Sequence, residues 1–252
     1  MSPDIVVAIL PFVAVGFAAQ LIDGALGMAF GVISSTLLIS LGVPPAAASA
    51  GVHTVESFTT AASGISHVLH RNVDWKLFGR LVIPGVIGGV MGAYVLTQIH
   101  ADAARPIVLA YLGAIAIYLI WRGLVSPPKA REPKWVGPLG FAGGFLDASG
   151  GGGWGPVVTG NLLLQGADPR RTIGTVNTAE FFLTVTISAT FIAALGWEAF
   201  TSATVGLLIG GLLAAPLGGY FASRIAPKRL LILVGAVLLI TSGYGIAKLL
   251  LA

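Results

Sequence analysis

Four acidic residues lie in otherwise apolar sequence, where an ionised side chain is costly to insert and usually has a function. Asp23 begins the stretch DGALG, and Asp147 begins DASGGGGWG. Glu56 lies in VHTVESF and Glu180 in VNTAEFF, which share Val, Thr, Glu and Phe at the same spacing. Acids at bilayer depth can carry protons or help to open a pathway. We therefore predict a coupling or gating role for Asp23, Glu56, Asp147 and Glu180.

The glycine run after Asp147 suggests a binding site for an anion. Glycine allows left-handed backbone conformations and close approach, so that several N–H groups can converge on one ligand. No Lys or Arg lies deep in an apolar segment, so backbone donors, helix ends and hydroxyls would have to hold the anion. The predicted substrate-binding residues are Gly24, Gly27, Ser149, Gly150, Gly151, Gly152, Gly153, His53, Thr54, Asn177 and Thr178.

Each of these residues also has a purely structural explanation. Asp23 and Asp147 are typical helix N-caps, and capping is compatible with lining a site. The glycines allow close helix packing. Glu56 and Glu180 fall on polar helical faces spaced by three and four residues, so each could form an inter-helix hydrogen bond instead. If the two glutamates carry protons, replacing either by Gln should flatten the pH dependence of transport.

The composition identifies the class of protein. Hydrophobic residues make up 56% of the 252 and charged residues 10%, and the mean hydropathy is +0.92, whereas soluble domains carry about 25% charged residues. The 14 Lys and Arg lie in short connections rather than on one face, so we expect no nucleic-acid partner. The absence of Cys excludes disulfides, thiolate metal sites and cysteine nucleophiles. The N-terminus lacks a basic signal-peptide region, so we expect the first segment to be retained.

The chain contains an internal repeat. At an offset of 124, 14 of the 45 positions in residues 16–60 are identical, including Asp23 with Asp147 and Glu56 with Glu180. Chance similarity between apolar segments does not align two acids in each half. We predict a first membrane repeat at 1–125, a cytoplasmic linker at 126–134 and a second membrane repeat at 135–252.

Each half is expected to contain three membrane-crossing helices, which need ~20 apolar residues each. A broken apolar unit precedes each set of three, interrupted at DGALG in the first half and at DASGGGGWG in the second. The arms of these units, about 11 to 18 residues long, are short for a crossing. The broken units are 5–41 and 136–166, and the crossings are 46–69, 77–97, 105–122, 172–195, 199–222 and 229–248.

The basic residues favour broken units that fold back to the side from which they came. That arrangement places 12 of the 14 Lys and Arg on one side, whereas spanning units would divide them 8 to 6. We therefore predict an all-α polytopic membrane protein built of two inverted repeats. Each repeat is a broken re-entrant helix pair followed by three transmembrane helices, with both termini outside the cell.

The doubled layout, with an Asp- and Gly-rich break opening each half, resembles the sulfite exporter TauE/SafE family of membrane transporters. The likeness covers essentially the whole chain. The family's glycine-rich signature is visible at 149–153, followed by Pro156, whereas the matching stretch at 24–31 lacks the glycine run. The resemblance implies small sulfur-containing anions, such as sulfite and organosulfonates, as substrates.

We expect export of such an anion across the bacterial inner membrane, because an inside-negative potential contributes ~2.3 kcal/mol per 100 mV to a departing monoanion. The nearest alternative is proton-coupled uptake of a small oxyanion such as thiosulfate or a sulfonate. A non-transporting scaffold or assembly protein is the third hypothesis. The HExxH and GxSxG motifs are absent, so we predict no enzyme activity. We expect no cofactor and no metal, and as partners the anion, the lipid bilayer and further copies of the chain.

Overall fold

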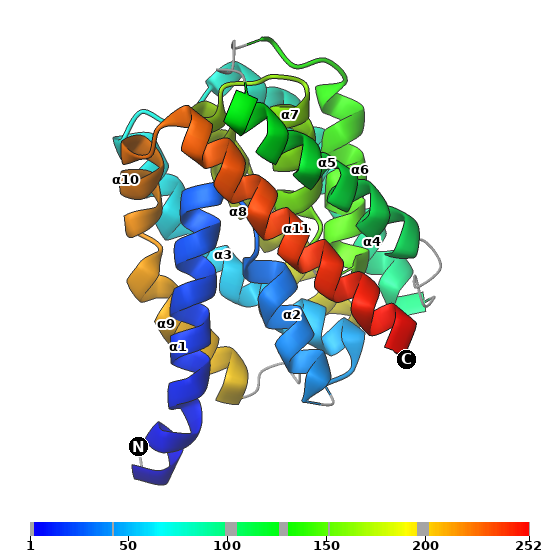
Figure 1. Ribbon diagram of the computed structural model, residues 1–252. Helices are drawn as coiled ribbons and strands as arrows, with labels where there is room; N and C mark the ends of the chain where they lie inside the picture. The colour runs from blue at the N-terminus through cyan, green and yellow to red at the C-terminus, as the bar shows by residue number, and fades with distance from the viewer. Residues whose placement is uncertain are drawn as a thin grey trace.

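The computed structural model describes residues 3–41, 43–98, 105–125, 131–150, 152–195 and 202–251, and every regular element in them is helical (Figure 1). The first half contains α1 (Pro3–Leu26), α2 (Phe30–Ser40), α3 (Pro45–Leu69), α4 (Trp75–Gln98) and α5 (Arg105–Val125). The second half contains α6 (Val136–Gly150), the π-helical turn η2 (Gly155–Thr159), α7 (Gly160–Leu164), α8 (Pro169–Leu195), α9 (Ser202–Ala214), α10 (Leu217–Arg224) and α11 (Pro227–Leu251).

The prediction of an all-α membrane protein is confirmed. Within the described residues, four helices are long and apolar enough to cross a bilayer, and a fifth crossing results if the bent pair α9 and α10 counts as one. Large apolar side chains such as Leu10, Ile65 and Ile83 lie exposed on the outside of the bundle, where lipid would cover them. The polar side chains of α3, in contrast, are largely buried.

The first interruption lies later than the sequence suggested. Helix α1 continues through Asp23 and Gly24 to Leu26 and is 24 residues long, so its arm is not short. The chain breaks only at 27–29, where Gly27 and Ala29 adopt left-handed φ values of 72° and 109°. An isolated Asp-Gly pair is compatible with a helix, whereas left-handed residues end one.

The second interruption matches the first at the same offset of 124 residues. Helix α6 ends at Gly150, and helical structure resumes at Trp154 and continues through η2 and α7. Gly152, with φ of 131°, lies in this break. The glycine run is therefore only partly non-helical. Gly150 is helical, and Gly151 lies outside the described residues.

Equivalent helices of the two halves pack against each other in antiparallel directions. Along α5 and α11, the neighbours of Gly123 are Lys228 and Ile232, whereas Leu109 at the other end meets Gly245. Along α3 and α8, the side chain of Thr60 meets that of Thr184, its own counterpart in the repeat. Figure 1 shows α1 and α2 as a hairpin that opens toward the lower end, and α6 and α7 as one that opens toward the upper end.

This antiparallel pairing is the geometry that inverted repeats need. Twelve of the basic residues were predicted to share one side, and several contacts join their loops. Lys76 pairs with Glu132, the backbone N–H of Arg131 donates to the Gly166 carbonyl, and Arg170 donates to Asn72. These loops lie at the upper end in Figure 1, away from both termini. The orientation of this end relative to the cytoplasm stays a prediction, as do the domain boundaries.

One segment of the second half differs from a simple crossing pattern. The predicted segment 199–222 is divided into α9 and α10, which are bent by 48°. The bend lies at 215–216, and Pro216 cannot donate the backbone hydrogen bond that a continuous helix needs. Pro84, in contrast, lies inside the continuous helix α4.

Two further pairs of closely packed helices join the halves, since α1 packs along α9 and α4 packs along α6.

We predict that Gly88→Ala, on α4, lowers the midpoint of thermal unfolding, because the added Cβ would overlap the carbonyl oxygen of Phe141 on α6. Such overpacking typically costs about 1 to 3 kcal/mol. Thermal unfolding in detergent, followed by circular dichroism, measures the effect.

Gly79→Ala is the matched control on the same helix. A Cβ there meets nothing within 4 Å, and Ala is the better helix former by about 1 kcal/mol. We expect an unchanged or slightly higher midpoint. Equal losses in both variants would contradict the packing of α4 on α6.

Candidate functional site

The two chain breaks meet in the interior of the bundle. A Cβ at Gly31, in the first turn of α2, would lie 2.7 Å from the Cα of Gly152 in the second break. Reciprocally, a Cβ at Gly155 would lie 2.7 Å from the Cα of Met28 in the first break. The hydroxyl of Thr159 donates to the carbonyl oxygen of Gly27 over 2.9 Å. The glycines thus allow each break to contact, through the backbone, the first helical turn that follows the other break.

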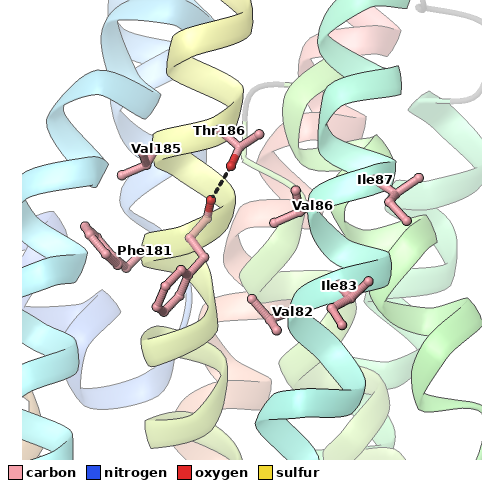
Figure 2. A pocket seen from close by; sticks show the side chains of 8 residues that line it. Val82, Ile83, Val86, Ile87, Phe181, Val185 and Thr186 are labelled. Atoms are coloured by element: carbon pink, nitrogen blue, oxygen red, sulfur yellow. Dashed lines mark hydrogen bonds between the residues drawn. The ribbon is translucent and has the colours of Figure 1, made fainter.

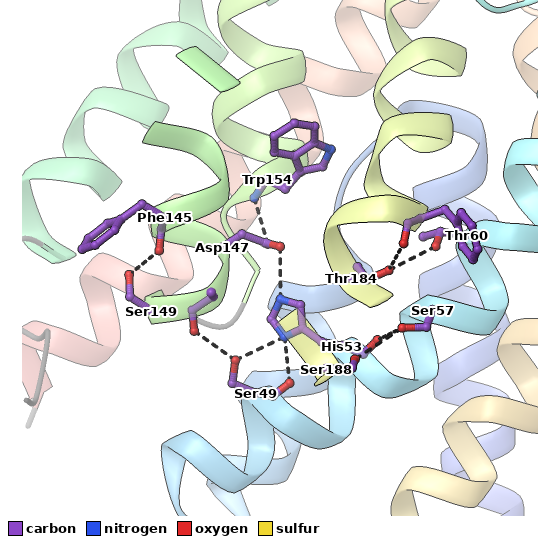
Figure 3. Close-up of polar contacts among 12 residues, drawn as sticks. Ser49, His53, Ser57, Thr60, Phe145, Asp147, Ser149, Trp154, Thr184 and Ser188 are labelled. Carbon is purple, nitrogen blue, oxygen red and sulfur yellow. Dashed lines mark hydrogen bonds and ion pairs between the residues drawn. The ribbon is translucent and has the colours of Figure 1, made fainter. Parts of the chain in front are cut away.

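One ion pair joins the halves beside this contact (Figure 3). His53 Nε2, on α3, lies 3.1 Å from Asp147 Oδ2, on α6, and both side chains are almost fully buried. The other ring nitrogen, Nδ1, lies 2.7 Å from the carbonyl oxygen of Ser49. A carbonyl can only accept, so Nδ1 carries a proton. The Nε2 contact therefore needs a second proton, held either by the imidazolium or by the carboxylic acid.

Asp147 also caps the helical segment that follows the second break. Its Oδ1 accepts a hydrogen bond from the backbone N–H of Trp154 over 2.9 Å, where unpaired amides concentrate positive charge. A contact between the Asp23 carboxyl and the Phe30 backbone is the counterpart in the first half. Neither Asp is itself an N-cap residue, because both lie in the preceding helix. The interpretation of the two Asp residues as N-caps is therefore wrong, although the side chain of Asp147 does bind the amide at the start of the next helical segment.

Asn177 occupies the repeat position of His53 and makes the equivalent contact between the halves. Its Nδ2 donates to the carbonyl oxygen of Asp23 over 3.1 Å, and its Oδ1 accepts from Ser63. This contact involves the backbone of Asp23 rather than its carboxyl group. An ionisable link in one half therefore corresponds to a neutral link in the other.

The two glutamates complete a cluster of four carboxyls. Glu56 and Glu180 are 3% and 4% exposed, and the Oε2 atom of each has no hydrogen-bond partner. Both interact electrostatically with Asp23 and Asp147. Among the described residues, no Lys or Arg forms an ion pair with any of the four. A carboxyl buried without a cation is stable chiefly as the neutral acid.

The structure brings together only part of the predicted site. Ser149, Thr54 and Thr178 each donate their hydroxyl to a carbonyl of the preceding turn of their own helix. Within the part of the chain that the structure describes, these hydroxyls are hydrogen-bonded to their own helices and not to the four acids. The predicted residues that gather around the two breaks are Asp23, Gly24, Gly27, His53, Glu56, Asp147, Gly152, Gly153, Asn177 and Glu180.

Trp154 is a central residue that the sequence analysis passed over. It is fully buried, and its indole N–H donates to the carbonyl of Val176. Its ring lies against Gly85 on α4, as the ring of Phe30 lies against Gly211 on α9. Its position could have indicated this role. An interfacial Trp lies at the end of an apolar segment, whereas Trp154 lies in the middle of one, between the glycine run and Pro156.

An apolar groove lies on the flank of the bundle, between α4 and α8 (Figure 2). Its volume is about 320 Å³, and its walls are formed by aliphatic and Phe side chains with one Thr. The hydroxyl of that residue, Thr186, already donates to the carbonyl of Phe182. This lining does not suit an anion. Among the described residues, no group of His, Asp or Glu is arranged to hold a metal ion.

Comparison with known families agrees with this architecture. The model of the family described as sulfite exporter TauE/SafE matches residues 12–245. The chain belongs to this family. It is 42% identical over 243 residues to the probable membrane transporter protein YtnM of Bacillus subtilis (strain 168), a match that covers 93% of this chain and 81% of the relative. No solved structure matches. The resemblance drawn from the sequence is thus confirmed, and this TauE/SafE member is a multi-pass membrane transporter.

We predict that His53 and Asp147 are energetically coupled. Asp147→Ala leaves the His53 Nε2 and the Trp154 N–H without their hydrogen-bond partner, and each unmade buried bond costs about 1 to 3 kcal/mol. Thermal unfolding of Asp147→Ala, His53→Ala and the double variant should therefore give a coupling energy of about 0.5 to 3 kcal/mol.

The exposed pair Lys76 and Glu132 provides the control. Their side chains are 70% and 81% exposed, so Glu132→Ala should change stability by less than about 0.5 kcal/mol. Additive effects of the two central variants would contradict the coupling between α3 and α6.

Proposed function

We propose that this transporter exports a small sulfur-containing oxyanion, sulfite or an organosulfonate, across the bacterial inner membrane. The observation that carries the proposal is the family match over residues 12–245. The buried junction between the breaks supports it, because helix ends and main-chain amides at membrane depth suit a small anion. We further propose that the loops bearing most of the basic residues face the cytoplasm and that both termini lie outside.

The acid cluster raises an electrostatic problem for any anion. Four carboxyls surround the junction, and His53 is the one side chain with a basic nitrogen paired to them in the described residues. An anion can approach only when the unpaired acids are protonated, because ionised carboxylates would repel it at short range. This observation favours proton-coupled uptake of an oxyanion as the second candidate function.

Flux measurements with a clamped membrane potential distinguish the two. In vesicles containing the purified protein, the exporter should move labelled sulfite toward the positive side when a potential is imposed without a pH gradient. Each 100 mV contributes ~2.3 kcal/mol to a monoanion. Protein-free vesicles provide the baseline. Flux that responds only to a pH gradient would support uptake with protons instead.

The glutamates are the proposed proton carriers. Glu56 interacts electrostatically with His53 on its own helix, with Asp23 on α1, with Asp147 on α6 and with Glu180 on α8. Glu56→Gln and Glu180→Gln preserve the size of the side chain but remove its titration. We expect each variant to transport with a flatter pH dependence than the wild type, measured as initial sulfite flux between pH 5 and 8.

Glu132→Gln, on the exposed loop, is the control and should keep the wild-type profile. Unchanged profiles in both central variants would remove the proton-carrying role. The unfolding midpoint of each variant shows whether a change in its flux comes from a loss of folding.

A further inference from the structure

The Asp147 carboxyl group is bound by two groups from different parts of the chain (Figure 3). Its Oδ2 lies 3.1 Å from His53 Nε2 on α3, and its Oδ1 accepts the backbone N–H of Trp154 over 2.9 Å. An imidazolium and a main-chain amide at the start of a helix are both groups that bind anions. The carboxylate therefore occupies a place in which an external oxyanion would find the same two donors.

The main chain beside this carboxylate is partly open. The helical segment that begins here is one apolar helix, Gly155–Leu164, made of η2 and α7. Gly152 and Gly153, in the break before it, are only half-buried, whereas Asp147 is 2% exposed. A small solute thus meets the backbone of the break before it meets the buried carboxylate.

An unpaired acid lies beside the same break. Glu56 is 3% exposed, and its Oε2 has no hydrogen-bond partner. Its Oε1 lies 3.1 Å from a Cβ placed on Gly31, and that Cβ would lie 2.7 Å from the Cα of Gly152. A neutral Glu56 can hold its proton on the free oxygen, where the O–H lacks an acceptor. An anion bound at the second break would supply one.

The first break has no equivalent charged donor. Asn177, at the repeat position of His53, is neutral and contacts the main chain of Asp23 rather than its carboxyl group. The other fully buried histidine, His67, is neutral as well, because its Nδ1 accepts from Asn72 while its Nε2 donates to a main-chain carbonyl. Within the described residues, the second break is therefore the one at which a buried histidine can offer a positive charge.

We propose that the substrate oxyanion binds in place of the Asp147 carboxylate, on His53 Nε2 and the Trp154 amide, when Asp147 is protonated. This exchange rests on the proposed function, and it assigns two donors and an internal competitor to the site. One proton enters the His53 and Asp147 pair as the anion binds, so that the imidazolium faces the anion and Asp147 is a neutral acid. The proton leaves when the carboxylate returns and displaces the anion.

The titratable groups that interact with this pair are acids. Glu56 on α3 interacts electrostatically with both partners. Asp23 on α1 and Glu180 on α8 interact with Asp147. Of these four acids, Asp147 alone has a basic partner among the described residues. Its negative charge is therefore the one that an incoming anion replaces, and the proton taken up on binding belongs to the pair.

Opposite effects of two variants test the exchange. At pH 6, where an imidazole is readily protonated, His53→Asn should raise the Kd for methanesulfonate at least about tenfold, because a bond from a charged donor is lost. Asp147→Asn should lower the Kd about tenfold, because its amide oxygen can still cap the Trp154 N–H but no longer competes as an anion. Isothermal titration calorimetry of the purified protein in detergent measures both values.

Asp168→Asn is the matched control. The Asp168 carboxyl also accepts a main-chain N–H at the start of a helix, that of Arg171, but this bond is exposed. Asn is an equally good cap, so the variant should keep the wild-type Kd.

A second measurement needs no variant. At pH 8 the wild-type protein should take up about one proton for each methanesulfonate bound, because the pair gains a proton as the anion enters. Calorimetry in buffers with different heats of ionisation gives this number. Methanesulfonate suits the measurement because it keeps its single negative charge over the whole pH range.

The outcomes separate the exchange from the proposed function. A purely structural pair would give weaker binding in both variants or unchanged binding in both, and either result overturns the exchange. The absence of proton uptake also overturns it, and this test remains if a variant does not fold. In these cases the function stands, provided that the wild type moves labelled sulfite.

The wild type also tests the function by itself. If it moves sulfite but does not bind methanesulfonate, the same opposite effects are required of the KM for sulfite. If it neither binds methanesulfonate nor moves sulfite, the proposed function fails, and the exchange fails with it.

Discussion

The structure depends on one constraint, that lipid cannot hydrogen-bond a polypeptide backbone. Two breaks in the helical chain can persist in the membrane interior only if each finds its partners within the protein. Here they find them largely in each other and in the helices around them. Thr159 bonds the Gly27 carbonyl, Asp147 bonds the Trp154 amide, and Gly31 contacts Gly152 without intervening side chains. The long helices provide the wall that keeps this junction away from lipid.

The burial that protects the breaks also determines the chemistry of the acids around them. Asp147 has His53 as a partner, whereas Glu56 and Glu180 have an unbonded oxygen each. An ionised carboxylate is costly at this depth and would repel an anion. Binding of an anion is therefore linked to protonation of the acids. An anion transporter with few cations in its interior can avoid repulsion by keeping its acids neutral. This arrangement makes proton coupling the central question about the transport cycle.

The repeat provides a nearly symmetric scaffold with an asymmetric interior. Thr60 meets Thr184 across the halves, and the breaks, the short helices after them and the antiparallel pairs all recur. The side chains beside the junction do not recur, since His53 corresponds to Asn177 and Thr59 to Leu183. The halves therefore share one helical frame, but at the repeat position of His53 and Asn177 the first half has an ionisable side chain and the second half a neutral one.

The sequence by itself determined the membrane class, the doubling of the chain, the family and the acids that become buried, because composition and repeat spacing are local properties. It misplaced the first break, since Asp23 and Gly24 look like a helix end while contacts with α9 and α10 keep them helical. Thr54 and Thr178 looked like site residues, but their hydroxyls bond their own helices. Only the tertiary structure decided that Asp147 meets His53 and that Glu56 and Glu180 each have an unbonded oxygen. These facts depend on how helices far apart in the chain are packed, and no local pattern encodes that packing.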